Sequence, residues 1–185
     1  RIYRRTKNSV CNRADALTQV DASNTAPRWS FGVDAGDGAE HTVGVKTIDG
    51  QLCLVLGKAQ KLMLVSEICM AGLHNVANVS AAFALAAAAG WDMEKCAIAV
   101  RAFHGLPHRC QWVAEKNGVR FYNDSKGTNV GATIAAIEGL AEGKNVVLIA
   151  GGEGKGADFS VLEPVVDRYV RALVLIGRDA DIIAA

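Results

Sequence analysis

The 185-residue sequence predicts an α/β protein in two parts, the first with antiparallel strands and the second with a parallel sheet. In the first part, two alternating apolar runs meet at Asp49 and Gly50, a pair typical of a tight β hairpin. In the second part, continuous apolar runs such as "NVVLIA" and "LVLIG" alternate with helical segments. Such runs are typical of buried strands in a parallel sheet.

The first part has its elements in a simple order. A short strand in "KNSVCN" and a helical turn in "RADALT" precede the hairpin, and "KLMLVSEI" predicts a third strand after it. The Ala-rich segment "HNVANVSAAFALAAAAGW" predicts a helix that ends at Gly90. Asp92 is placed to cap a second helix, which we expect to end at Gly105.

A domain boundary is expected at "GLPH", because Gly-Leu-Pro cannot continue a helix. We therefore assign residues 1–104 to one domain and residues 105–185 to a second. The second domain reads as strand "GVRFYND", a helix in "TNVGATIAAIEGLAEG", strand "NVVLIA", a helix in "SVLEPVVDRYVRA" and strand "LVLIG". Because ligands of parallel α/β sheets bind beyond the carboxyl ends of the strands, the loops after the first two strands mark the expected site.

Composition narrows the class of partner. With 20 basic and 19 acidic residues the net charge is +1, which does not suggest a nucleic-acid partner. The longest apolar run, residues 81–89, is too short to span a bilayer, and no signal peptide is visible, so we expect a cytoplasmic protein without membrane contact. The five cysteines are scattered and odd in number, which favours reduced thiols.

The segment "FYNDSKGTNVGAT" places polar side chains at the end of a strand. The carboxylate of Asp124 can accept from ribose hydroxyls, while Lys126 and Thr128 together suit a phosphate or a carboxylate, with Asn129 as a further donor. The alternative is a capped strand–helix turn, with Asp124 or Thr128 as the cap. Capping would explain one of these residues but not four.

The loop "GGEGKGAD", residues 151–158, is rich in glycine and carries Lys155. Glycines let backbone N–H groups approach an anion, and the lysine adds a positive charge. The loop is neither a Walker A sequence, since Ile149 and Gly156 stand where that pattern needs other residues, nor GxGxxG. Taken alone, it could equally be a flexible turn with a solvated lysine.

Two shorter motifs admit alternatives of their own. In "GLPHR", His108 and Arg109 could contact a base or a phosphate, although an ordinary surface histidine fits as well. In "HNVAN", Asn75 and Asn78 share one helical face and suit an adenine edge, although Asn75 could instead cap the helix. Cys110 could be a thiol of lowered pKa or a half-buried bystander.

Together, "HNVAN", "GLPHR", "NDSKGTNVGAT" and "GGEGKGADF" closely resemble the Mur ligase family, and in particular its D-glutamate-adding member. The similarity extends through "RIY", "FGV" and "GRD" and so covers essentially the whole chain. The resemblance implies that residues 1–104 form the later part of a central ATP-binding domain. It implies that residues 105–185 form an incomplete Rossmann-like C-terminal ligase domain.

The activity implied by this resemblance is ATP-dependent amide-bond formation, with ATP and Mg²⁺ as cofactors. The family member joins D-glutamate to UDP-N-acetylmuramoyl-L-alanine through an acyl phosphate, in the cytoplasmic synthesis of peptidoglycan. This implied role connects the protein to cell wall biogenesis, and through it to the control of cell shape and to cell division. We expect small-molecule substrates as its partners and a monomer as the full-length enzyme.

The resemblance also assigns a nucleotide site. By motif, Asn75 and Asn78 would meet the adenine, and Asp124 would hold the ribose. His108 and Arg109 would lie at the nucleotide, near the domain junction.

A second group of residues would carry the substrate and the chemistry. Lys126 would face the phosphate or the D-glutamate, and Thr128 and Lys155 would bind carboxylates of D-glutamate. Lys126 and His108 would be the catalytic residues. No metal ligand is expected within the chain, because the Mg²⁺ ligands and the P-loop of the family would lie outside it.

Two further expectations follow from the resemblance. The chain looks like a piece of a longer enzyme that alone binds nucleotide weakly and does not turn over. A hinge is expected at residues 103–107. Two alternatives stay open, a different ligase of the Mur or folylpolyglutamate type and a noncatalytic nucleotide-binding module.

Overall fold

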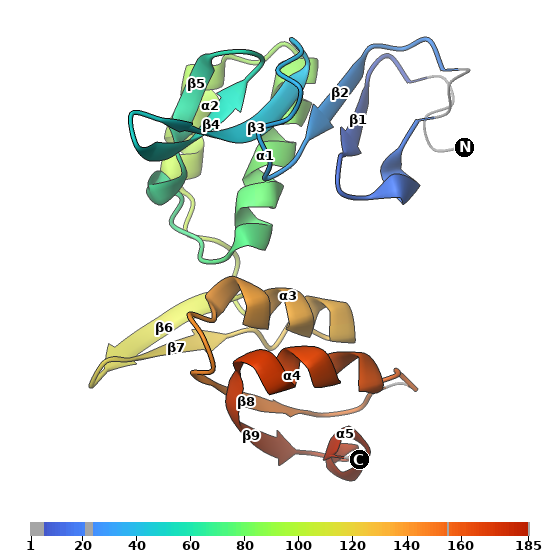
Figure 1. Ribbon diagram of the computed structural model, residues 1–185, viewed down its shortest axis with the longest axis vertical. Coiled ribbons are helices and arrows are strands. Elements are labelled where there is room, and N and C mark those ends of the chain that lie inside the picture. Colours follow the sequence, from blue (N-terminus) through green and yellow to red (C-terminus); the bar gives the residue numbers. More distant parts are fainter. Residues whose placement is uncertain (1–5, 21–23, 155, 185) are drawn as a thin grey trace. The chain divides into compact units, whose positions relative to one another are not determined.

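The computed structural model describes residues 6–20, 24–154 and 156–184 (Figure 1). Its contacts divide the chain into two compact units, Arg1–His104 and Gly105–Ala185. Each unit combines helices with strands, antiparallel hairpins occur in the first, and a parallel strand pair occurs in the second. The predicted α/β class is therefore confirmed.

A five-stranded mixed sheet forms the first unit, in the order β1-β2-β3-β4-β5. The first two pairings are parallel and the last two are antiparallel. The strands are β1 (Ser9–Asn12), β2 (Arg28–Phe31), β3 (Thr42–Ile48), β4 (Gln51–Leu56) and β5 (Gln60–Leu64), with 3₁₀ turns at η1 (Ala16–Thr18) and η2 (Val65–Glu67). The predicted strands and the early helical turn are all present.

The β3–β4 hairpin closes as the sequence predicts. Ile48 pairs with Gln51, so only Asp49 and Gly50 form the turn. Their φ angles are 50° and 76°, the left-handed backbone that a two-residue turn of type I′ requires at both positions.

Two helices follow, α1 (Leu73–Ala88) and α2 (Met93–Ala102). Gly90 follows α1 with a φ of 74°, and the Asp92 carboxylate accepts from the backbone N–H groups of Glu94 and Lys95 at 2.9 and 3.2 Å. Both predicted boundaries are confirmed. The end of α2 was expected at Gly105, but the backbone is already extended at Phe103.

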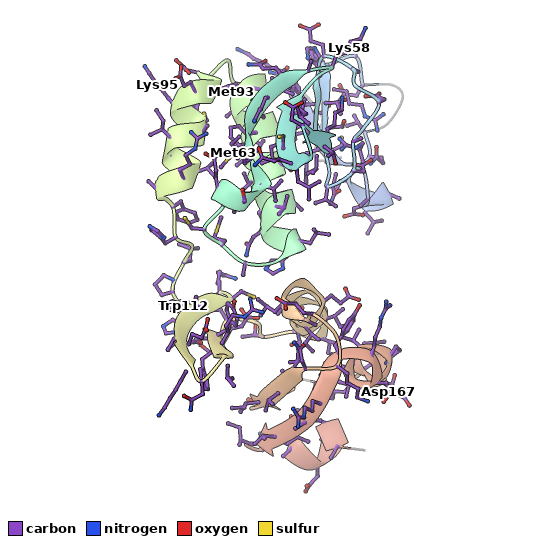
Figure 2. The ribbon with its side chains drawn as sticks, turned by 60° about the vertical axis from the view of Figure 1, so that its left-hand side comes forward. Lys58, Met63, Met93, Lys95, Trp112 and Asp167 are labelled. Carbon is purple, nitrogen blue, oxygen red and sulfur yellow. The ribbon has the colours of Figure 1, made fainter. Side chains whose placement is uncertain are left out.

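The core of the first unit lies between the sheet and these helices. Figure 2 shows Met63 within this layer, on the side of β5 that faces the helices. The fully buried side chains at its centre are Val43, Leu54, Met63, Phe83 and Ala84. Burial of this apolar surface is the main favourable term in the folding of the unit.

The second unit contains a hairpin and a βαβ element. Its members are β6 (Gln111–Lys116), β7 (Val119–Asn123), α3 (Val130–Leu140), β8 (Val146–Gly151), η3 (Ser160–Leu162), α4 (Glu163–Tyr169), β9 (Val170–Ile176) and α5 (Ala180–Ala184). Strands β6 and β7 are antiparallel, whereas β8 and β9 are parallel. The side chains of Ile137, Val165 and Val170 form the buried cluster between α3, α4 and the β8–β9 pair.

Three expectations for this unit are wrong in detail. Strand β7 does not join the parallel pair among the described residues, because Asn117 and Gly118 adopt φ angles of 53° and 75° and turn the chain into a hairpin with β6. Helix α4 ends at Tyr169, since β9 begins at Val170. Among the described residues, the apolar strands are covered on one face: α3 and α4 pack there, and Ile149 on the other face is 66% exposed.

No helix in the described ranges is long and apolar enough to cross a membrane.

Arg13 joins β1 to the loop that precedes β3. Its guanidinium donates to the Asp34 carboxylate, to the Ser30 hydroxyl at 3.2 Å and to the Val43 carbonyl at 3.0 Å. The hydrogen bond from Arg13 is the largest cause that holds the pKa of Asp34 below its usual value. A Cβ at Gly32 would lie 2.8 Å from the guanidinium, so glycine makes room for this contact.

We expect Arg13→Ala to lower the free energy of unfolding by about 2 kcal/mol at pH 7, because the buried Val43 carbonyl and the half-buried Ser30 hydroxyl lose a charged donor. The lowered pKa means that the Asp34 pairing contributes stability above its ordinary pKa of 3.8 and loses it as the pH falls through the lower folded-state pKa. The difference between variant and wild type should therefore shrink in strongly acidic solution. Urea unfolding at pH 7 and near pH 3 measures this, with the exposed Lys61→Ala as the control. A pH-independent difference would contradict the role of the ion pair.

Candidate functional site

Asn75 and Asn78 lie on one face at the start of α1. The helix is capped by Gly72, whose φ is 96°, so the alternative in which Asn75 caps the helix is wrong. The Asn75 amide instead donates to the Ala71 carbonyl at 2.7 Å, and the Asn78 amide donates to the Asn75 side-chain oxygen at 3.4 Å. Asn78 is exposed and Asn75 half-buried, so the linked pair presents an amide that can both donate and accept.

His74, directly before this pair, was missed by the sequence analysis. Its Nδ1 is buried and has no hydrogen-bond partner within the part of the chain that the structure describes. Buried polar atoms are rarely left unpaired, so the Nδ1 atom of His74 is an uncommon feature. The place of His74 directly before Asn75 in the "HNVAN" motif is the sequence signal that could have identified it.

In the second unit, the predicted segments at residues 105–109 and 123–129 meet. The Lys126 N–H donates to the His108 carbonyl at 3.0 Å, and the Cys110 N–H donates to Oδ1 of Asp124 at 2.9 Å. The Asn123 amide nitrogen lies 3.0 Å from Nδ1 of His108, within hydrogen-bond distance. The two motifs therefore form one structural site, a contact that the sequence analysis did not predict.

The turn at residues 108–110 has an uncommon backbone. His108 and Cys110 have φ angles of 65° and 42°, a left-handed conformation that costs about 1–2 kcal/mol for a residue with a side chain. The bonds to Asp124 and Lys126 hold the turn in this form, and the Gln111 side chain accepts from the His108 N–H at 2.9 Å. Strained residues of this kind persist where the surroundings fix them, often at functional sites.

The side chains around this turn are open to a ligand. His108, Arg109, Lys126 and Thr128 are exposed, and Asp124 is half-buried. One unit of the fold thus presents two cationic side chains and a hydroxyl next to a carboxylate. This combination suits a phosphorylated or carboxylated molecule with ribose hydroxyls.

Asn129, rather than Asp124 or Thr128, caps the helix that follows. Its side-chain oxygen accepts from the Ala132 N–H at 2.8 Å, so the expected alternative has a different cap. Asn129 is thereby explained as a structural residue. Asp124 also has a structural role through Cys110, but only Oδ1 is used in that bond. A Cβ at Gly127 would lie 2.5 Å from Oδ2 of Asp124. A larger residue at position 127 would therefore displace this second oxygen.

Burial of Cys110 is the main cause that raises the pKa of its thiol to about 11, and the charge of Asp124 together with its hydrogen bond adds to the effect. The interpretation of Cys110 as a thiol of lowered pKa is therefore wrong. The thiol stays protonated at neutral pH and does not compete with the carboxylate as a second anion.

Lys155 lies outside the described residues, as does the whole "RIY" motif, residues 1–3. The rest of the glycine-rich loop follows β8, and its backbone is hydrogen-bonded at Gly152 and at Gly154. The Gly152 N–H donates to the Ile176 carbonyl at 3.1 Å, and the Gly154 N–H donates to the Asp179 carboxylate at 2.6 Å. Asp179 was not a predicted site residue, although it belongs to the "GRD" sequence that forms part of the resemblance.

Within the described ranges, no three His, Cys, Asp or Glu side chains gather as a metal site would require.

Comparison with known proteins shows the class to which this α/β chain belongs, the ligases of the Mur type. Residues 108–185 match the family described as "Mur ligase, glutamate ligase domain". Together with the whole-chain similarities below, this match shows that the chain belongs to the Mur ligase family. The predicted resemblance is confirmed.

Curated relatives match along the full chain. It is 48% identical to the UDP-N-acetylmuramoylalanine–D-glutamate ligase of Pseudomonas syringae pv. tomato and 49% identical to that of Pseudomonas aeruginosa. Each match covers 100% of this chain and 41% of the relative, so the chain spans about two fifths of their length.

A solved structure supports the fold. The crystal structure of MurF from Acinetobacter baumannii superposes with a TM-score of 0.63 at 20% identity, and the match covers 96% of this chain and 41% of that one. At this identity the likeness concerns the fold alone.

The Asp124–Cys110 contact can be tested by alkylation. Because the charge and hydrogen bond of Asp124 help to raise the pKa of the Cys110 thiol, Asp124→Asn should lower that pKa and speed alkylation by iodoacetamide several-fold at pH 8–9. Peptide mass spectrometry would follow Cys110, with the exposed Cys69 of the same molecule as the reference. Equal Cys110 rates in variant and wild type would contradict the contact.

Proposed function

We propose that this chain is part of an ATP-dependent ligase that joins D-glutamate to UDP-N-acetylmuramoyl-L-alanine through an acyl phosphate. The observation that carries the proposal is the contact of the His108 turn with the Asp124–Lys126 segment. It gathers the residue types that a nucleotide and a dicarboxylate require. The names of the relatives support this choice of substrates.

The proposed nucleotide contacts follow from the motifs of each unit taken by itself. Asn75 and Asn78 meet the adenine through the amide pair at the start of α1, and Oδ2 of Asp124 accepts from a ribose hydroxyl. His108 and Arg109 lie against the nucleotide. The two units then correspond to the later part of a central ATP-binding domain, residues 1–104, and to a C-terminal ligase domain, residues 105–185.

The proposed chemistry depends on charge and position. ATP passes its γ-phosphoryl group to the lactyl-alanine carboxylate, the D-glutamate amine attacks the acyl carbon, and phosphate leaves as the amide forms. Such transfers are accelerated mostly by positioning and by electrostatic stabilisation. Lys126 supplies positive charge where negative charge develops, and His108 fixes the turn that carries Lys126, since its carbonyl accepts the Lys126 N–H. Thr128 and Lys155 hold the carboxylates of D-glutamate.

Mg²⁺ would accompany ATP in this reaction. The described residues provide no cluster of three metal ligands, so its ligands would come from elsewhere in the enzyme. The proposed setting is the cytoplasmic stage of peptidoglycan synthesis, in which a monomeric enzyme acts on small molecules and so affects cell shape and division.

The first test is phosphate release from ATP by the protein expressed from its complete gene, with UDP-N-acetylmuramoyl-L-alanine and either isomer of glutamate. Release should require the D-isomer, because the carboxylate contacts fix the configuration at the amine-bearing carbon. A sample limited to the 185 residues should release none. Release with L-glutamate or with another amino acid would favour a different Mur or folylpolyglutamate-type ligase. No release with any acceptor would favour a noncatalytic nucleotide-binding module.

Thr128 allows a second test. Thr128→Val keeps the side-chain shape but removes the hydroxyl, so the KM for D-glutamate should rise roughly 10- to 100-fold, the range expected for one hydrogen bond to a charged group. The KM for ATP should change little. Steady-state kinetics would measure both, with the exposed neighbour Ser125→Ala as the matched loss of a hydroxyl. Equal effects of the two variants would argue against Thr128 as a substrate ligand.

A further inference from the structure

The loops after β8 and β9 interlock at the carboxyl end of the strand pair. Gly151 and Gly152 have φ angles of 153° and 111°, and a Cβ at Gly151 would collide with the Ile176 carbonyl. On the other strand, a Cβ at Gly177 would lie 2.8 Å from the Gly152 nitrogen. Glycine is required on both sides because the backbones touch.

Asp179 makes three hydrogen bonds, two of which connect the two loops. Its carboxylate accepts from the Gly154 N–H at 2.6 Å, and its own N–H donates to the Gly152 carbonyl at 3.2 Å. Its carbonyl accepts from the Ile183 N–H at 3.1 Å, which starts α5. The glycine-rich loop is thus bonded at Gly152 and Gly154 to a single residue at the beginning of a helix.

The bond to Gly154 is the one that bears on the site. A carboxylate that accepts from a backbone N–H forms a charge-assisted bond, shorter and stronger than a bond between neutral groups. The Ala157 N–H donates to the Gly154 carbonyl at 2.9 Å, so both polar groups of the Gly154 backbone are engaged. The nearby pair of Arg178 and Glu153, 3.7 Å apart and exposed, adds little by comparison.

We propose that Asp179 is a positioning residue for the amino-acid substrate. Its carboxylate fixes the backbone of Gly154, in the glycine-rich loop whose sequence carries Lys155. This inference rests on the proposed function, in which Lys155 binds that substrate. Asp179 itself acts through the loop and does not touch the substrate.

The test compares Asp179→Ala with Asp179→Asn in the protein expressed from its complete gene. The alanine variant loses the acceptor for Gly154, so the KM for D-glutamate should rise about tenfold while the KM for ATP stays within about twofold. The asparagine variant keeps a side-chain oxygen that can accept the same N–H, so its KM for D-glutamate should stay within about threefold of wild type. Asp167→Ala, an exposed aspartate on α4 that is labelled in Figure 2, is the matched control and should leave both constants unchanged.

Two kinetic results would overturn the proposal. One is an unchanged KM for D-glutamate in Asp179→Ala. The other is a parallel loss of every kinetic constant and of thermal stability in both Asp179 variants, because that would make Asp179 a residue of general stability. A rise in the KM for D-glutamate in Asp179→Ala, with the KM for ATP and the thermal stability unchanged, separates positioning from stability.

A readout without turnover separates this proposal from the proposed function. If the wild-type protein forms no product with D-glutamate, the proposed function fails, and hydrogen exchange at the Gly154 amide decides the local part of the inference. Faster exchange of that amide in Asp179→Ala, with wild-type exchange in Asp167→Ala, would support the role of Asp179 in fixing the loop. Unchanged exchange would overturn it.

Discussion

The hydrogen bond from the Cys110 N–H to the Asp124 carboxylate is the interaction on which the candidate site depends. It connects a turn at the start of the second unit to the end of β7, across 14 residues of sequence. Without it, the left-handed backbone at His108 and Cys110 would be costly and the turn would relax. The exposed cations at Arg109 and Lys126 would then lose their fixed relation to the carboxylate.

This hydrogen bond gives the two carboxylate oxygens of Asp124 different roles. Oδ1 of Asp124 supports the turn, and Oδ2, which lies beside Gly127, is the oxygen that we propose for the ribose hydroxyl. A single aspartate can therefore be both a structural residue and a binding residue, which explains why a capping interpretation and a ribose-binding interpretation both fitted the sequence. Asn129 resolves the choice, because it supplies the cap of α3.

Local signals in the sequence predicted the elements of the fold well. Asp49 and Gly50 predicted a hairpin because few other pairs accept two left-handed residues, and Asp92 predicted the start of α2 because its carboxylate satisfies free N–H groups. The turn at Asn117 and Gly118 carried the same kind of signal and was missed, since the apolar run after it suggested a parallel strand. One-sided burial of β8 and β9 was beyond the sequence, because apolar runs do not show which face a helix covers.

The site was predicted as separate motifs, and the structure adds their connections. Motif residues such as Asp124 and Lys126 stand out by chemical type, whereas the contact between residues 108–110 and 124–126 depends on chain geometry that no local pattern encodes. Asp179 was overlooked for a related reason: an aspartate after a strand is common, and only its distance to Gly154 distinguishes it.

The raised pKa of the Cys110 thiol has a consequence for oxidative stress. With a pKa of about 11, very little of the thiol is ionised at neutral pH, and peroxide attacks the thiolate rather than the thiol. A cysteine thus stands beside the carboxylate of the candidate site and is a poor target for oxidation to sulfenic acid. We therefore expect peroxide to oxidise Cys110 more slowly than a cysteine whose thiol has an ordinary pKa.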